Sequence, residues 1–165
     1  MKQSISILIL CFLTFFDAMG QEKSVCCDAP APVASGMIPQ LTVKNLAQTV
    51  DFYSRVLGFE VLQSVRQSDE LSYVLLKSGS VLLAFQLESY LKDKYPQLKA
   101  WKAGKGSALI IETSAINRFY ERIKGRAEVI SNLTVTFFGA QEFVITDPEG
   151  YVLIFRSAEN PAGDK

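Results

Sequence analysis

The chain has 165 residues, of which 48% are hydrophobic and 21% charged, enough to form one domain with a proper core or two small modules that share one. Its 17 basic and 17 acidic side chains give a formal net charge of zero at pH 7. A neutral chain has no electrostatic reason to bind nucleic acid or an anionic membrane, so we expect neither as a partner.

Residues 1–20 have the layout of a secretory signal peptide. A basic start at Lys2 is followed by an apolar run over residues 5–16 and by small residues before Gln21. The run is too short for a comfortable membrane span, and an uncleaved N-terminal anchor is the alternative. We expect cleavage before Gln21, export to the periplasm or the exterior, and no membrane contact for the mature chain.

Cleavage would leave Cys26 and Cys27 as the only thiols. Adjacent cysteines can stay reduced, form a strained vicinal bridge or pair with another molecule, and we expect no catalytic role for them. They lie in residues 21–37, which are rich in Ala, Pro and Ser, follow no helix or strand period, and are predicted to be a flexible linker. The folded domain is expected over residues 38–157, followed by a short tail over 158–165.

The first predicted module covers residues 38–88 and begins with a strand over 38–43. Asn45 is a candidate N-cap for the helix that follows, and Gly58 ends that helix. The apolar residues of the helix are spaced by four, three and four positions, which places them on one face: Leu46, Val50, Tyr53 and Leu57. Three strands are predicted next, over 59–65, 72–77 and 81–87, with a tight turn at Gly79 before the last.

Residues 88–106 are predicted to connect this module to a second one, in a partly helical segment that Pro96 keeps short. The second module covers residues 107–157. It begins with a strand over 107–112 and a helix that Ser114 can cap. Strands are then expected over 127–131 and 134–138, and last comes an apolar hairpin over 141–155, whose turn is Asp147-Pro148-Glu149-Gly150.

The two modules repeat a short sequence at the same place in their order of elements. Phe-Tyr-Ser-Arg-Val-Leu-Gly at 52–58 aligns with Phe-Tyr-Glu-Arg-Ile-Lys-Gly at 119–125, and four of the seven residues are identical. Glu-Val follows closely in both cases, at 60–61 and 128–129. This repetition indicates an internal duplication, in which each unit packs its helix on the back of its own sheet.

In this order and at this spacing, the segments resemble the vicinal oxygen chelate superfamily, the glyoxalase, bleomycin resistance and extradiol dioxygenase group. The resemblance is carried by residues 38–46, 51–53, 57–59, 111–112, 119–124 and 142–151. It implies an α+β fold, in which two βαβββ modules form a cupped mixed sheet with the helices on its outer face. The front faces of the two modules would then enclose a cleft.

Members of this superfamily usually hold a divalent metal with His and Glu from four strand positions, but this chain contains no histidine. The resemblance places those positions on Gln40, Leu83, Ala108 and Ile154. They offer one amide oxygen and three hydrocarbon groups, which a divalent ion does not favour as ligands. We therefore expect no metal and no other cofactor.

The chain is most similar to the metal-free, bleomycin-resistance-like branch, although Gln141 stands where that branch often has an arginine. This likeness implies a homodimer that sequesters a small organic molecule in an apolar cleft. The alternatives are a glyoxalase-like lyase or isomerase, or a dioxygenase-related enzyme, with a non-standard site, and a scaffold that binds only another protein.

Strand alternation and aromatic character predict which side chains line the cleft. The candidates are Gln40, Thr42, Tyr73, Leu83, Phe85, Trp101, Ala108, Phe138, Glu142 and Ile154. The alternative is that these side chains simply fill the cup. Glu142 is the best candidate for a general acid or base, because it lies in an apolar strand; it can equally be a structural carboxylate that pairs with an arginine or with backbone amides.

Overall fold

The computed structural model describes residues 34–158 except positions 101, 103 and 105. The predicted signal peptide, Cys26, Cys27 and the cleft candidate Trp101 therefore lie outside the described residues. Within the described part of the chain, no helix is both long enough and apolar enough to cross a membrane.

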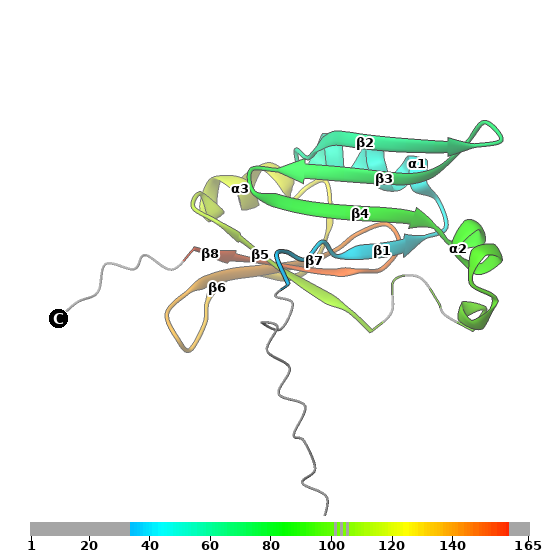
Figure 1. Ribbon diagram of the computed structural model, residues 1–165. Helices are drawn as coiled ribbons and strands as arrows, with labels where there is room; N and C mark the ends of the chain where they lie inside the picture. Colours follow the sequence, from blue (N-terminus) through cyan, green and yellow to red (C-terminus); the bar gives the residue numbers. More distant parts are fainter. Residues whose placement is uncertain (1–33, 101, 103, 105, 159–165) are drawn as a thin grey trace, which may run out of the picture. The chain divides into compact units, whose positions relative to one another are not determined.

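Two modules of the same order follow one another along the chain (Figure 1). The first consists of β1 (Gln40–Val43), α1 (Leu46–Asp51), the π-helix η1 (Phe52–Val56), β2 (Glu60–Gln67), β3 (Glu70–Ser78) and β4 (Val81–Leu87). The second consists of β5 (Ala108–Thr113), α3 (Ile116–Ile123), β6 (Glu128–Val135), β7 (Gln141–Thr146) and β8 (Val152–Ser157). The connection contains α2 (Glu88–Lys94) and the 3-10 helix η2 (Pro96–Leu98).

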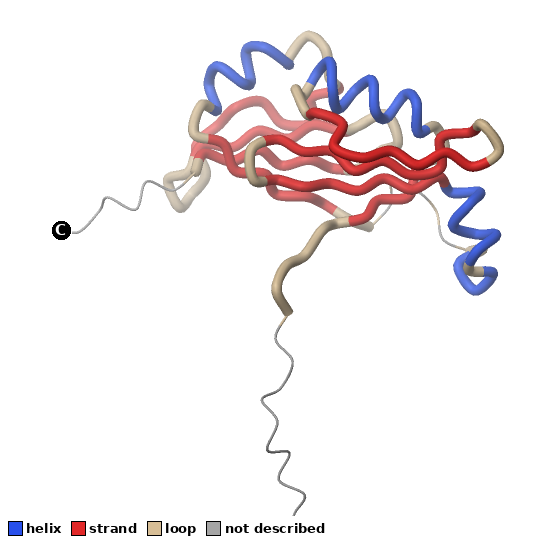
Figure 2. Tube along the Cα trace, turned by 45° about the horizontal axis from the view of Figure 1, so that its top comes forward, coloured by secondary structure: helices blue, strands red, loops and turns tan. Residues whose placement is uncertain are grey.

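Each module forms its own four-stranded mixed sheet. The strand orders are β1-β4-β3-β2 and β5-β8-β7-β6, with the first two strands of each order parallel and the other pairs antiparallel. The helices α1 and α3 lie on one side of the strands (Figure 2). The predicted α+β fold with two βαβββ modules is confirmed.

The first helix begins where the sequence predicts but changes its type halfway. Asn45 caps it, accepting a hydrogen bond from the Gln48 amide at 3.0 Å. From Phe52 the helix widens into a π-helical turn, in which the Leu57 amide donates to the Phe52 carbonyl at 3.3 Å. The helix then ends at Gly58, whose φ of +81° is accessible to glycine at little cost.

Two expectations about the second module are wrong. Ser114 does not cap α3: the N-cap is Ala115, which has no side chain to accept a hydrogen bond from the helix amides. The two strands expected over 127–131 and 134–138 are one strand, β6. The register with β7 shifts on either side of Ser131, so the chain bulges at this point instead of turning. Asn132 stays in β6, and its Oδ1 accepts a hydrogen bond from the Tyr120 hydroxyl at 2.7 Å.

The buried side chains of both modules form one continuous core between the sheets and their helices. In the first module, the Tyr53 ring lies 4.6 Å from the Phe85 ring, centroid to centroid. In the second, Phe143 and Phe155 stack at 5.0 Å, with 17° between the ring planes. Phe119 of α3 packs on Phe155, with 4.8 Å between the ring centroids. Because each fully buried side chain of this size contributes about 1.5–3 kcal/mol, these aromatic contacts tie each helix to its sheet.

The turn of the last hairpin joins the second module to the first. Both the amide and the carbonyl of Thr42 bond the Tyr151 hydroxyl, at 3.1 and 2.8 Å. The Glu149 carboxylate accepts hydrogen bonds from the amides of Lys44 and Asn45, at 2.8 and 2.7 Å. The turn predicted as a local feature of one hairpin therefore also fixes the segment between β1 and α1.

Candidate functional site

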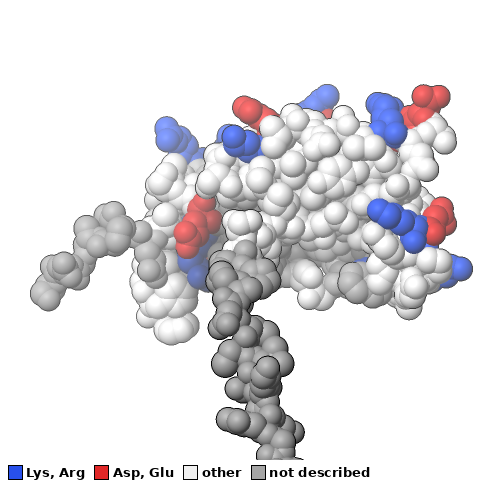
Figure 3. Space-filling view, viewed as in Figure 1, with Lys and Arg blue, Asp and Glu red and all other residues white. Residues whose placement is uncertain are grey.

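The face of the first sheet that points away from α1 is lined by uncharged polar and apolar side chains. Figure 1 looks onto this face, and the space-filling view from the same side shows it largely free of charge, with Lys, Arg, Asp and Glu gathered at its margin (Figure 3). We use the term open faces for this face of the first sheet and for the face of the second sheet that points away from α3. An uncharged surface of this kind suits an organic molecule better than an ion.

Three predicted cleft residues meet on the open face of the first sheet around a residue that was not predicted, Gln86. Thr42 and Tyr73 are its register partners on the two neighbouring strands. Gln40 donates a hydrogen bond from its Nε2 to Oε1 of Gln86 at 3.4 Å. Gln86 also donates to the Ser72 carbonyl at 3.3 Å, which orients its amide group.

The expectation that Leu83 and Phe85 line the cleft is wrong. Both are buried on the helix side of β4, and Phe85 packs against Tyr53. The positions of β4 that point to the open face are Leu82, Ala84 and Gln86, one residue out of step with the prediction. The prediction counted from the turn glycine, but the two turns are not equivalent. Two residues, Gly79 and Ser80, separate Ser78 from its partner Val81, whereas residues 147–151 separate Thr146 from its partner Val152.

On the second sheet, Ala108, Glu142 and Ile154 all lie on the open face. Their neighbours along each strand, such as Leu153 and Phe155, are buried on the helix side. Ile110 pairs with Ile154 in the register and is 56% exposed, so this open face carries accessible hydrocarbon. Phe138 lies in the turn between β6 and β7, at the edge of the same face.

Glu142 is bound to Arg156, its cross-strand partner on β8. Both Nε and Nη2 of Arg156 donate to Oε2 of Glu142, at 3.0 and 2.7 Å. The ring of Phe138 covers the guanidinium at 5.0 Å from its central carbon. The sequence prediction missed Arg156, although it lies two positions after Ile154 and alternation alone places it on the same face.

The family's four metal-ligand positions do not suit a metal in this fold. Of these positions, Gln40, Ala108 and Ile154 lie on the open faces, where their register partners are Ala84, Val152 and Ile110, and Leu83 is buried on the helix side. They supply one neutral amide and hydrocarbon, so they lack the nitrogen and carboxylate donors that a divalent ion needs. Across the described residues, no three His, Cys, Asp or Glu side chains lie close enough together to hold an ion.

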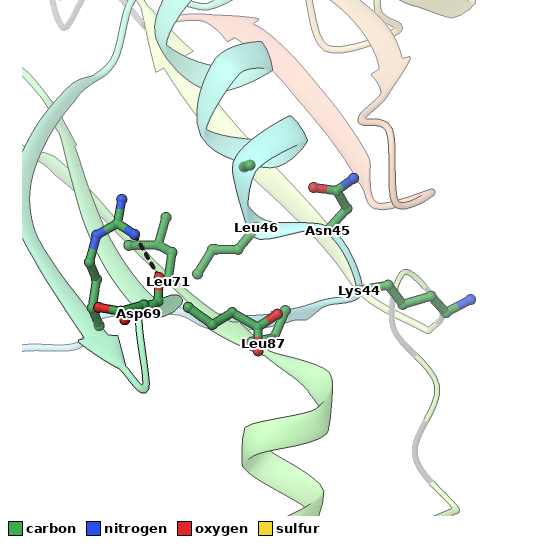
Figure 4. Close-up of a pocket in the computed structure, with 9 residues that line it drawn as sticks. Lys44, Asn45, Leu46, Asp69, Leu71 and Leu87 are labelled. Atoms are coloured by element: carbon green, nitrogen blue, oxygen red, sulfur yellow. Dashed lines mark hydrogen bonds between the residues drawn. The ribbon is translucent and has the colours of Figure 1, made fainter.

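A hollow of about 520 Å³ lies elsewhere, between the β1–α1 loop and the β2–β3 hairpin (Figure 4). Leu46, Leu71 and Leu87 form its apolar floor, while the Lys44 side chain extends away from it. Its lining contains none of the predicted cleft residues. The helix amides nearby are already bound by Asn45 and Glu149. The lining also includes the charged residues Arg66, Asp69 and Glu70, so this hollow is more polar than the open faces.

A second, smaller hollow of about 90 Å³ lies between the modules on the helix side. Leu57 and Phe59 line it from the first module, and Ile111, Phe119 and Phe155 from the second. It is smaller than the pockets of roughly 300–1,000 Å³ that hold organic ligands, so it is not a candidate ligand site.

The family model described as Glyoxalase/Bleomycin resistance protein/Dioxygenase superfamily matches residues 35–155. Among curated proteins, none matches the sequence.

Similar solved structures include a protein of unknown function from Agrobacterium tumefaciens str. C58, with 21% identity and a TM-score of 0.63, covering 76% of this chain and 98% of that one. A member of the glyoxalase/bleomycin resistance protein/dioxygenase superfamily from Sphaerobacter thermophilus DSM 20745 has 18% identity, a TM-score of 0.62 and coverages of 76% and 98%. TioX from Micromonospora sp. ML1 has 18% identity, a TM-score of 0.60 and coverages of 75% and 98%. At these identities the likeness extends to the fold alone.

Proposed function

Because the chain belongs to the Glyoxalase/Bleomycin resistance protein/Dioxygenase superfamily, we propose that it binds a small organic molecule on the open faces of its sheets and holds it without a metal ion. One observation carries this proposal: the register partners Ile110 and Ile154 present hydrocarbon on the open face of the second sheet, and Ile154 is one of the four positions that the resemblance assigns to metal ligands. Gln40 and Gln86 add a few neutral hydrogen-bonding groups beside them. Apolar surface with sparse polar groups is the usual lining of an organic ligand site.

Native mass spectrometry of the purified protein tests this directly. We expect a co-purifying compound of a few hundred daltons that stays with the folded chain and is released on denaturation. Ile154→Glu places a carboxylate on the apolar face and should abolish retention, whereas Arg118→Glu, at an exposed position of the helix α3, serves as a control. A stoichiometric divalent metal in the wild-type protein would contradict the proposal.

The protein is further proposed to act as a homodimer, with the ligand held between two copies. The support is the apolar surface that one copy leaves exposed on its sheets, including Val65, Ile110 and Ile130, which are 42%, 56% and 57% exposed. Sedimentation velocity should give twice the mass of the chain, and Ile110→Glu should shift it to the monomer. Tyr95→Glu, at an exposed aromatic residue of the connecting segment, should leave the mass unchanged. A wild-type monomer at all concentrations would overturn this part.

Export is proposed on the layout of residues 1–20. The intact mass of the protein recovered from outside the cytoplasm should correspond to a chain that begins at Gln21. Recovery of the full-length chain in the membrane fraction would instead favour the uncleaved anchor.

Binding is favoured over catalysis because Glu142, the candidate acid or base, already accepts two hydrogen bonds from Arg156 on one oxygen. A carboxylate held in this way is less available to exchange a proton with a substrate. Turnover of a glyoxalase-type or dioxygenase-type substrate, lost in Glu142→Gln, would reverse this preference.

A further inference from the structure

The ion pair between Glu142 and Arg156 is the main charged feature within the proposed ligand face, and its geometry leaves some of its hydrogen-bonding groups unpaired. Both donated hydrogen bonds end on Oε2 of Glu142. Within the described residues, neither Oε1 of Glu142 nor Nη1 of Arg156 has a hydrogen-bond partner. One acceptor oxygen and one donor nitrogen of the ion pair are therefore left for a ligand.

A ligand can reach both groups. The side chains of Arg156 and Glu142 are 26% and 20% exposed, so the pair is neither fully buried nor fully solvated. Partial burial strengthens electrostatic interactions with an incoming group, compared with the same pair on an open surface.

Apolar surface surrounds the pair. Val144 and Ile154, register partners of each other, follow it along β7 and β8. Phe138 lies over the guanidinium, and its neighbour Phe137 is fully exposed with its ring centroid 4.9 Å away. A flat apolar body can lie on this surface while its polar end meets the ion pair.

We infer that Glu142 and Arg156 together select ligands whose polar end is a neutral donor–acceptor group, such as a primary amide or a lactam, on a flat apolar body. This inference rests on the proposed function and specifies the chemical class of its ligand. A neutral amide carries both a donor that suits Oε1 of Glu142 and an acceptor that suits Nη1 of Arg156. A carboxylate is repelled by Glu142, and an amidinium is repelled by Arg156, so each ion gains one partner and is opposed by the other.

Glu112 is the third charged group nearby, because it is the register partner of Arg156 on β5. It is exposed, so water and salt screen its charge more than they screen the ion pair. Its negative charge makes an anionic polar end the least favoured of the three. The expected order of affinity is therefore neutral, then cationic, then anionic.

Three fragments with the same ring and different polar ends test the inference: benzamide, benzamidine and benzoate. Each is titrated into ¹⁵N-labelled full-length protein, and dissociation constants are taken from amide shifts near Val144 and Ile154. For the wild-type protein, benzamide should bind at least about fivefold more tightly than benzoate and measurably more tightly than benzamidine. This order is measured without any substitution, so it does not depend on a variant that folds.

Two substitutions should shift the order in opposite directions. Glu142→Gln removes the negative charge and should improve benzoate relative to benzamidine, whereas Arg156→Gln should improve benzamidine relative to benzoate. Glu121→Gln is the control, because Glu121 forms an exposed ion pair with Lys124 on α3, and it should leave the order unchanged.

The outcomes separate the two proposals. If none of the fragments shifts the amides near Val144 and Ile154, binding on the open face is wrong, and the inference falls with it. If the fragments bind there but a charged fragment binds best, only the selection by Glu142 and Arg156 is wrong. The same holds if neither substitution changes the order of affinity.

Discussion

The hydroxyl of Tyr53 donates a hydrogen bond to Oδ2 of Asp147 at 3.1 Å, and both side chains are buried. Tyr53 belongs to the helix of the first module, and Asp147 opens the last turn of the second, 94 positions further on. Oδ1 of Asp147 meanwhile accepts from the amides of Glu149 and Tyr151, at 2.9 and 2.8 Å. One carboxylate thus closes its own turn and binds the other module.

Tyr53→Phe should destabilise the protein, because it leaves Oδ2 of Asp147 buried without the hydroxyl that satisfies it. We expect a loss of about 1–3 kcal/mol in the free energy of unfolding, measured by urea denaturation at neutral pH. Tyr120→Phe is the matched control: its hydroxyl bonds Asn132 within the second module, in a more exposed place, and should cost less. Equal losses would contradict a special role for the contact between modules.

Asp147 should also make the stability depend on pH. Burial raises the pKa of its carboxyl above the ordinary value of 3.8, against the opposing effect of the hydrogen bonds that it accepts. A raised pKa in the folded state favours the protonated form, so the contribution to stability is full below the ordinary pKa and is lost as pH rises through the raised one.

Asp147→Asn removes this titration. The free energy of unfolding of the wild-type protein, minus that of the variant, should therefore fall as pH rises from below the ordinary pKa of 3.8 towards neutral. Urea denaturation of both proteins across that range measures the difference. A difference that grows with pH would mean that hydrogen bonding to the ionised carboxylate outweighs the cost of its burial.

Glu149→Ala should loosen the start of α1, because the amides of Lys44 and Asn45 lose their common acceptor. A loss of about 0.5–2 kcal/mol is expected, with increased hydrogen exchange at these two amides. Glu149→Gln keeps an oxygen in the same position and should retain most of the protection. If the alanine and glutamine variants exchange equally fast, the contact contributes nothing measurable.

Gly150→Ala tests the conformation of the last turn. Gly150 has a φ of +89°, where an alanine is strained even though an added Cβ would have space. The substitution should cost about 1–2 kcal/mol. Gly125→Ala is the control, because Gly125 is not at positive φ and nothing lies within 4 Å of an added Cβ; it should be neutral or slightly stabilising. The same loss at both glycines would contradict the conformational explanation.

Local patterns predicted most of the fold correctly, because they depend on neighbours in the sequence. The Asn45 cap, the end of the first helix at Gly58 and the Asp147–Gly150 turn need only the residues around them. The errors occurred where a partner from elsewhere decides. The sequence pattern predicted two strands over 127–131 and 134–138, but pairing with β7 and the hydroxyl of Tyr120 keep Asn132 within the single strand β6.

The sequence by itself determined the order of the elements and showed that the chain has no histidine to serve as a metal ligand, because alternation, caps and residue identity are local properties. Only the tertiary structure decided which face of β4 is open, that Arg156 binds Glu142 beneath Phe138, and that Tyr53 meets Asp147. These relationships join strands and modules whose register is set by packing of the whole core. A register shift of one residue reverses every face, and no local pattern reports it.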